Sequence, residues 1–252
     1  GLHDAHGDTR DVHDSRLTVD AALCGRLREQ ARHLGVSVAS LMHQAWAQVL
    51  AQLSGREEVV FGTVLLGRLQ GGEGAERALG MFINTLPLRV SVGAAGTAEG
   101  VRLTHQRLAR LLAHEQASLA LAQRCSGVPA SQALFTSLLN YRHSAPAKVE
   151  LRQAWQGIEQ IAAHERSNYP LVVNIDDLGE GLVLTVQAVS QVDGGQVCRL
   201  LATALAQLAD ALQQAPATPL HTLSQLAPGE RELLLQGFNA TRRDYPHEHA
   251  LH

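Results

Sequence analysis

Long segments with helical periodicity alternate with short apolar runs along this chain, and this alternation restricts its fold more than any other feature. After Asp20, which can cap a helix, apolar residues recur at helical spacing as far as Gly35, which can end it. The same pattern from Ser37 to Gly55 predicts a second helix. Further helices are predicted over residues 99–118, from about residue 196 to a proline-containing break at 213–219, and over 228–238. The apolar faces of the long helices need a sheet or other helices to cover them.

Five short runs rich in β-branched and apolar residues are predicted to be strands. They are residues 58–66, 85–92, 134–141, 171–176 and 182–189. The last two flank a glycine-containing turn and are expected to form a hairpin. Asp176 and Asp177 lie at this turn. Turn chemistry explains them better than paired acid and base roles, because neighbouring strand residues point to opposite faces. The mixed order of elements predicts the α/β class, with a mixed sheet covered by helices.

Composition excludes several classes of protein. With 252 residues, of which 45% are apolar, the chain can bury a real core. The net charge is -3 and the Lys and Arg residues are scattered, so the sequence has no basic patch that would bind nucleic acid or an anionic membrane. Cys24, Cys125 and Cys198 are far apart, which suits a reducing compartment better than disulfides or zinc. The start is polar and no run of 18 apolar residues occurs, so a cytoplasmic location is expected. The glycine start and polar end suggest a piece of a longer protein.

The motifs of common catalytic classes are absent or weak. Ser37 lacks the glycine pattern of a nucleophile elbow and is better explained as a helix cap. The glycine-rich loop at 67–74 lacks the lysine of a phosphate-binding loop. Three histidines at 247–252 lie in a polar tail without metal-ligand spacing, so no metal site is expected. His114-Glu115 could carry protons or could simply belong to a solvated helix face, and the sequence leaves both readings open.

Residues 79–89, LGMFINTLPLR, resemble the fifth core motif of the condensation domains of non-ribosomal peptide synthetases. Residues 59–64 followed by Gly67-Arg68 are similar to a strand and loop of that family, and residues 134–141 are similar to a later strand. Residues 238–246, FNATRRDYP, resemble the linker that leads into an adenylation domain. The resemblance therefore covers nearly the whole chain.

The resemblance implies one half of a two-lobed, V-shaped fold like that of chloramphenicol acetyltransferase. The family's catalytic HHxxxDG sequence belongs to the N-terminal lobe and is absent here. Ala188 and Val189 stand in the two histidine places of a degenerate counterpart that keeps Asp193 and Gly194. We therefore expect no catalytic residue in this chain and no activity from it alone. Residues 1–16 are expected to be an inter-lobe linker, 17–215 the C-terminal lobe, and 216–252 a linker towards an adenylation domain.

The resemblance also implies site residues and partners. The residues expected to line the tunnel between the lobes are Gly80, Met81, Phe82, Asn84, Thr85 and Asn140. For Asn84, a role in satisfying neighbouring backbone is an equal alternative. Arg68 and Arg89 could contact pantetheine phosphate or acidic carrier helices, although surface ion pairs are the commoner role of arginine. The expected partners are the N-terminal lobe, donor and acceptor peptidyl carrier proteins, which supply phosphopantetheine, and the adenylation domain; no covalently bound cofactor is expected.

Two segments point to a subtype. Residues 67–74 and 114–124 resemble the dual class that epimerises the donor residue and then condenses it. A non-catalytic carrier-binding or docking module remains the main alternative. A free-standing acyltransferase is disfavoured, because no histidine in the chain has an aspartate four residues after it.

Overall fold

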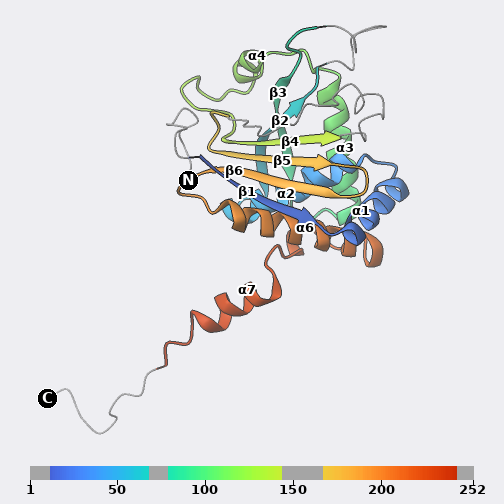
Figure 1. The fold of residues 1–252 in the computed structure, drawn as a ribbon. Helices are drawn as coiled ribbons and strands as arrows, with labels where there is room; N and C mark the ends of the chain where they lie inside the picture. Colours follow the sequence, from blue (N-terminus) through green and yellow to red (C-terminus); the bar gives the residue numbers. More distant parts are fainter. Residues whose placement is uncertain (1–11, 68–78, 144–166, 243–252) are drawn as a thin grey trace, which may run out of the picture.

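A mixed β-sheet forms the centre of the structure, which is a computed structural model that describes residues 12–67, 79–143 and 167–242. Its strands are β1 Val12–Val19, β2 Glu58–Leu65, β3 Asn84–Ser91, β4 Ser137–His143, β5 Leu171–Asp177 and β6 Leu182–Val189. Their order across the sheet is β1-β6-β5-β4-β2-β3 (Figure 1). β4 runs parallel to β2 and β5, and the other neighbours are antiparallel. The predicted α/β class with a mixed sheet is confirmed.

Four long helices pack on one face of the sheet, which we call the helix face. They are α1 Ala21–Leu34, α2 Val38–Ser54, α3 Thr97–Leu112 and α6 Gly194–Gln214. The caps follow the sequence prediction: Asp20 and Ser37 accept backbone hydrogen bonds at the starts of α1 and α2, and Gly35 and Gly55 adopt the left-handed conformation at their ends. The main core lies between these helices and the helix face, with Trp46 and Phe61 among its fully buried side chains.

The opposite face of the sheet, the second face, carries a smaller apolar cluster. Phe135, Leu138 and Val172 form its buried part, with Tyr169 stacked on Phe135. Gly62 of β2 permits this packing, because an added Cβ would lie only 2.3 Å from the Leu138 side chain. The short helix α4, Leu119–Cys125, lies beside this region.

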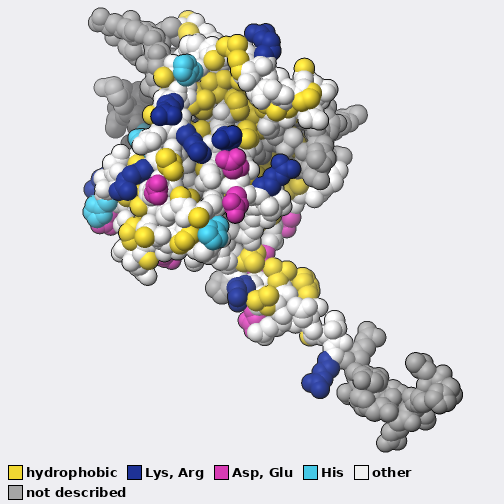
Figure 2. All heavy atoms as spheres, turned by 180° about the vertical axis from the view of Figure 1, so that it is seen from behind, with side chains coloured by type: hydrophobic (Ala, Val, Ile, Leu, Met, Phe, Trp, Pro, Cys, Tyr) yellow, Lys and Arg dark blue, Asp and Glu magenta, His cyan; other side chains and the backbone are white. Residues whose placement is uncertain are grey.

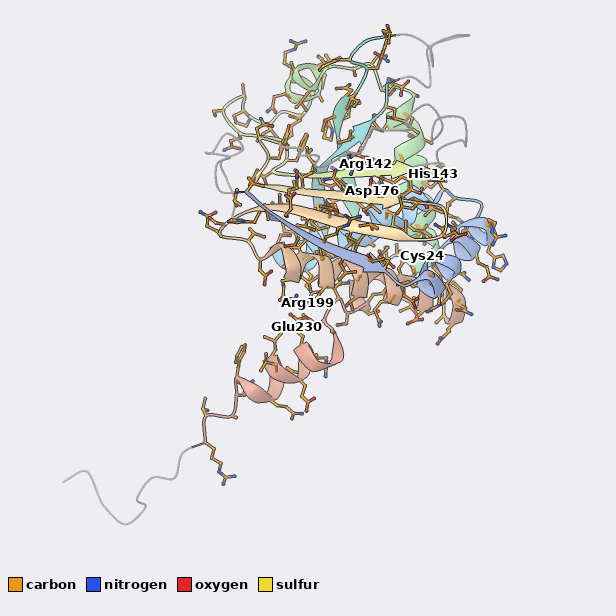
Figure 3. All side chains as sticks on the ribbon, viewed as in Figure 1. Cys24, Arg142, His143, Asp176, Arg199 and Glu230 are labelled. Carbon is orange, nitrogen blue, oxygen red and sulfur yellow. The ribbon has the colours of Figure 1, made fainter. Side chains whose placement is uncertain are left out.

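A polar clamp fixes the β5–β6 hairpin to α1. The Asp177 carboxylate accepts hydrogen bonds from Tyr141 at 2.7 Å, Arg28 at 2.8 Å and the Gly179 backbone at 3.0 Å. Burial opposes the charge of Asp177, but these hydrogen bonds hold the pKa of its carboxyl below the ordinary value. The bond to Gly179 is the turn chemistry predicted for the aspartate pair. Asp176 points to the other face and pairs with Arg142 (Figure 3).

The structure corrects both predicted boundaries of the lobe. β1 begins at Val12, so the linker predicted for residues 1–16 is wrong over 12–16. β1 is an edge strand with four of its eight residues exposed, which explains its polar sequence. The linker predicted from 216 also begins too early. Leu220 and Leu223 are buried in the main core, and Leu220 packs so closely on α3 that a Cβ on Gly100 would lie 2.2 Å from it.

Three predicted elements have different ends. The helix predicted over 99–118 is α3, which stops at Leu112, and the strand predicted over 134–141 is β4, which begins at Ser137. The helix predicted over 228–238 is divided into α7, Pro228–Glu232, and a π-helical turn η4, Leu233–Gly237. α7 and η4 project away from the sheet and its helices (Figure 1).

Candidate functional site

The motif segment lies at one end of the β2–β3 hairpin and exposes apolar side chains. Leu65 pairs with Asn84, so Leu66 and Ile83 lie beside one another just past the ends of the two strands. Four side chains form what we call the apolar edge: Leu66, Leu79, Met81 and Ile83. Met81 is 99% exposed. Clustered exposed apolar residues of this kind mark surfaces that another protein or domain covers.

Gly67 closes the base of the apolar edge. Its φ is +67°, and a Cβ placed on it would lie 1.8 Å from the backbone oxygen of Phe82. Gln116 donates a hydrogen bond of 2.7 Å to the Gly67 carbonyl. Only glycine at position 67 therefore allows this residue to lie against the backbone of Phe82 and to accept the hydrogen bond from Gln116, in the turn that follows α3.

Asn84 ties the start of β3 to the same turn. Its Nδ2 donates to the carbonyl oxygens of Glu115 at 2.8 Å and Ala117 at 2.7 Å, and its Oδ1 accepts from the Thr85 backbone at 2.9 Å. Both amide donors are thus engaged with backbone. The geometry favours the alternative in which Asn84 satisfies neighbouring backbone groups. In this role Asn84 fixes the position of the motif segment.

Thr85 and Asn140 lie at the same level of the second face, on the two strands that flank β2, and Val64 of β2 lies between them. Thr85 lies opposite Val64, and Asn140 follows Leu139, the partner of Thr63, so all three are level across the sheet. Asn140 donates a 3.0 Å hydrogen bond to the buried Asn174 side chain on β5. We call Thr85, Asn140 and Asn174 the polar row; they lie at one level across the second face, and Val64 interrupts the row between Thr85 and Asn140.

The two arginines expected to meet the carrier are not both described. Arg68 lies outside the described residues. Arg89 is at the far end of β3, with its side chain 67% exposed and 3.7 Å from Glu58. An exposed pair at this distance contributes little to stability and leaves Arg89 available to another partner.

The degenerate corner between β6 and α6 has a structural role. Asp193 caps α6 by accepting from the Gln196 backbone at 3.0 Å. Gly194 allows α6 to approach β1, because an added Cβ would lie 2.9 Å from the Ser15 hydroxyl. Ala188 is buried on the helix face, opposite the exposed His13 of β1. His13 belongs to a segment that the sequence assigned to a linker and that forms the edge strand β1.

His43 is a buried polar residue that the sequence analysis did not single out. Its Nδ1 lies 2.7 Å from the Ala39 carbonyl and must donate to it, so its Nε2 accepts from the Thr63 hydroxyl at 2.6 Å. Burial lowers the pKa of His43 to about 4, so the ring is neutral at pH 7. The available signal was its place on the broad apolar face of α2.

His114-Glu115 lies beyond the end of α3, so its predicted place on a helix is wrong, and its role as a proton carrier stays a prediction. His114 is exposed and Glu115 is buried. Among the described residues, no group of His, Cys, Asp and Glu side chains could hold a metal ion. The described helices also include none that is long and apolar enough to cross a membrane. The histidines at 247–252 lie outside the described residues.

Comparisons with known proteins agree on one family. The family model described as Condensation domain matches residues 4–235. The chain is 46% identical to malpibaldin synthetase and 48% identical to malpinin synthetase, both from Mortierella alpina, over all of its 252 residues. It spans only 4% and 3% of those two proteins. Among solved structures, the condensation domain of the Monacolin K polyketide synthase MokA has a TM-score of 0.67 and 21% identity, over 87% of this chain and 51% of that one.

Proposed function

This chain belongs to the condensation-domain family, and from that premise we propose that it is the C-terminal lobe of a peptide-bond-forming condensation domain in a non-ribosomal peptide synthetase. The assignment to one lobe of a two-lobed domain rests on one observation: the chain spans 51% of a single solved condensation domain. The degenerate corner is consistent with this, because Ala188 and Val189 occupy the places where the family motif has histidines.

The proposed reaction joins two substrates that carrier proteins hold as thioesters. The acceptor amine attacks the donor carbonyl carbon, the C–N bond forms, and the C–S bond to the donor pantetheine breaks. The amine loses a proton and the departing thiolate gains one. In this proposal the group that handles the proton belongs to the N-terminal lobe, since this chain carries no HHxxxDG sequence.

The role left to this chain is to shape the reaction site. We place the apolar edge against the N-terminal lobe, where it excludes water from the tunnel. The polar row with Thr85 and Asn140 would then face the tethered substrates and help to hold the amine near the carbonyl. Asn84 supports this wall by fixing the start of β3.

Carrier proteins would present both substrates on phosphopantetheine, which enters this site as part of the substrate. Arg89 is the described candidate for contact with its phosphate or with an acidic carrier helix. The dual epimerising subtype, the adenylation domain as a neighbour, and a cytoplasmic location remain predictions of the same proposal.

Complementation tests the proposal. The N-terminal lobe of the parent synthetase is added in trans to the chain, with one donor-loaded and one acceptor-loaded carrier, and the dipeptide is measured by mass spectrometry. Product that requires both lobes supports the proposal, and chiral analysis of the donor residue tests the subtype. Carrier binding without any rescue of product would instead support the docking module.

A further inference from the structure

Asn174 is a carboxamide at a position where the fold calls for an apolar side chain. It lies in β5, between β6 and β4 in the middle of the sheet, and is only 3% exposed. Its neighbours in the strand, Val173 and Ile175, are fully buried in the main core. Asparagine is disfavoured in strands, and burying its amide costs free energy that a valine would not cost. Neither strand propensity nor core packing therefore explains Asn174.

The Asn174 side chain orients the amide of Asn140. The two residues are register partners on the parallel strands β4 and β5, and Asn140 Nδ2 donates a 3.0 Å hydrogen bond to Asn174 Oδ1. Because a carboxamide is planar, Asn140 Oδ1 is then turned away from Asn174 and can only accept. Asn174 is too deeply buried to touch a substrate, whereas Asn140 is only partly buried. Any effect of Asn174 on a substrate must therefore pass through Asn140.

The pairs on either side of Asn140 keep its backbone in place without help from Asn174. Leu138 lies opposite Val172 in the apolar cluster of the second face. Arg142 lies opposite Asp176 and donates a 2.7 Å hydrogen bond to its carboxylate. Loss of the amide partner would free the Asn140 side chain to rotate, while the strand pairing stayed intact. The contact thus sets a side-chain orientation rather than the fold.

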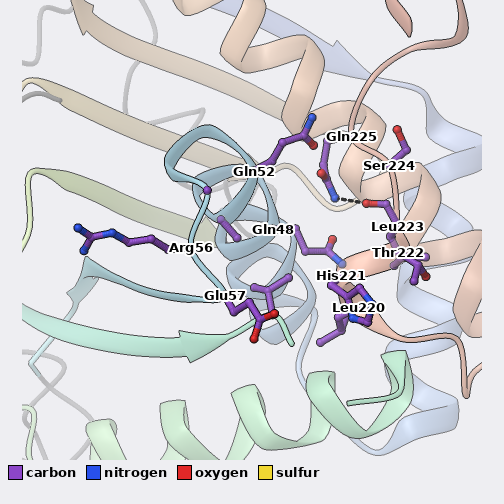
Figure 4. Close-up of a pocket in the computed structure, with 13 residues that line it drawn as sticks. Gln48, Gln52, Arg56, Glu57, Leu220, His221, Thr222, Leu223, Ser224 and Gln225 are labelled. Carbon is purple, nitrogen blue, oxygen red and sulfur yellow. Dashed lines mark hydrogen bonds between the residues drawn. The ribbon is translucent and has the colours of Figure 1, made fainter. Parts of the chain in front are cut away.

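Two other features of the molecule do not explain Asn174. A cavity of about 420 Å³ lies between the end of α2 and residues 220–225 (Figure 4), and Asn174 does not line it. The segment of α7 and η4 projects away from the domain body (Figure 2), so it does not cover the second face. The contact with Asn140 is the feature of Asn174 that calls for a role.

We propose that Asn174 is a positioning residue, which holds Asn140 so that its Oδ1 accepts a hydrogen bond from the acceptor amine during attack. The inference rests on the proposed function, in which Asn140 faces the tethered substrates. An N–H held by Asn140 aims the lone pair of the nitrogen at the donor carbonyl carbon. As the C–N bond forms, the nitrogen becomes positive, so a fixed carbonyl dipole stabilises the transition state more than the ground state. Asn140 itself neither gains nor loses a proton.

Kinetics of complementation test the proposal, with the N-terminal lobe in trans and both loaded carriers. Asn174→Val removes the acceptor but suits a buried strand. It should lower kcat by about tenfold or more and leave the KM for the acceptor carrier within about twofold, because orientation and not carrier binding is lost. The urea midpoint should stay the same or rise. A kcat within twofold of the wild type, or a rise in KM at constant kcat, would overturn the proposal.

A conservative variant and a matched control separate orientation from a general effect of mutation. Asn174→Thr has the shape of valine and a hydroxyl that can accept from Asn140, so its kcat should return to within about threefold of the wild type. Gln44→Leu removes another buried amide, whose Oε1 accepts from Thr104 at 2.7 Å on the helix face, and should leave kcat unchanged. A threonine variant as slow as the valine variant, or an equal loss in Gln44→Leu, would refute the role of Asn174.

A double-mutant cycle tests whether Asn174 acts through Asn140. Asn140→Ala should lower kcat, and the addition of Asn174→Val should then lower it by no more than about twofold, because the side chain to be oriented is already gone. Two losses that multiply would show that Asn174 acts independently of Asn140 and would contradict the inference.

Nuclear magnetic resonance gives a readout that needs no activity. In the ¹⁵N-labelled chain, one Hδ2 resonance of Asn140 should lie downfield in the wild type, lose that shift in Asn174→Val and regain it in Asn174→Thr. Resonances unchanged in Asn174→Val would overturn this inference alone. Wild-type lobes that together form no dipeptide would instead refute the proposed function on which it rests.

Discussion

Lowering the pH from 7.5 to 5.0 should destabilise the chain through His43. Burial lowers the pKa of this ring to about 4 in the folded state, against 6.5 in the unfolded chain. Between these two values the unfolded state binds a proton that the folded state does not, so stability falls as the pH falls. Each pH unit in this window is worth about 1.4 kcal/mol, and the window covers about 1.5 units of the experiment. We therefore expect a loss of about 2 kcal/mol.

Urea denaturation followed by circular dichroism measures this loss, with the variant His43→Gln as the control. The folded-state pKa of Asp177 is depressed below 3.8, so its contribution is lost only at lower pH and does not enter the window. The variant removes the titrating ring and should lose about 2 kcal/mol less than the wild type over the same pH range. A wild-type stability that does not change, or an equal loss in both proteins, would refute the buried neutral state of His43.

Three other predictions follow from the motif segment. Asn84→Ala should lower the free energy of unfolding by about 1–3 kcal/mol in urea titrations, because two backbone carbonyls lose their donors; a loss below about 0.5 kcal/mol would contradict this assignment. Gly67→Ala should cost more than about 1 kcal/mol by the same assay, whereas Gly25→Ala in open space on α1 should be stabilising. Met81→Asp should leave the melting temperature unchanged but reduce complementation by the N-terminal lobe at least tenfold, in contrast to Leu53→Asp at the end of α2.

Local signals explain most of what the sequence predicted correctly. Caps at Asp20 and Ser37 and glycine ends at Gly35 and Gly55 act within a few residues, so α1 and α2 were predicted closely. The hairpin of β5 and β6 was found for the same reason, from apolar runs on both sides of a short turn.

Tertiary context explains what the sequence missed. The polar strand β1 forms only because β6 offers it a partner, and residues 216–226 pack only because Leu220 fits over Gly100. The polar row on the second face depends on β4 lying beside β2, an order that no local pattern specifies. Thr85 and Asn140 could thus be predicted as single site residues, but not their place at the same level on the two sides of β2.

Peptide formation by the purified 252-residue chain, with and without the N-terminal lobe, is the most direct test of the account. With both loaded carriers present, the chain alone should give no dipeptide above the uncatalysed background. Addition of the N-terminal lobe should restore product formation. Dipeptide formed at the same rate without that lobe would contradict the claim that this chain only shapes the reaction site.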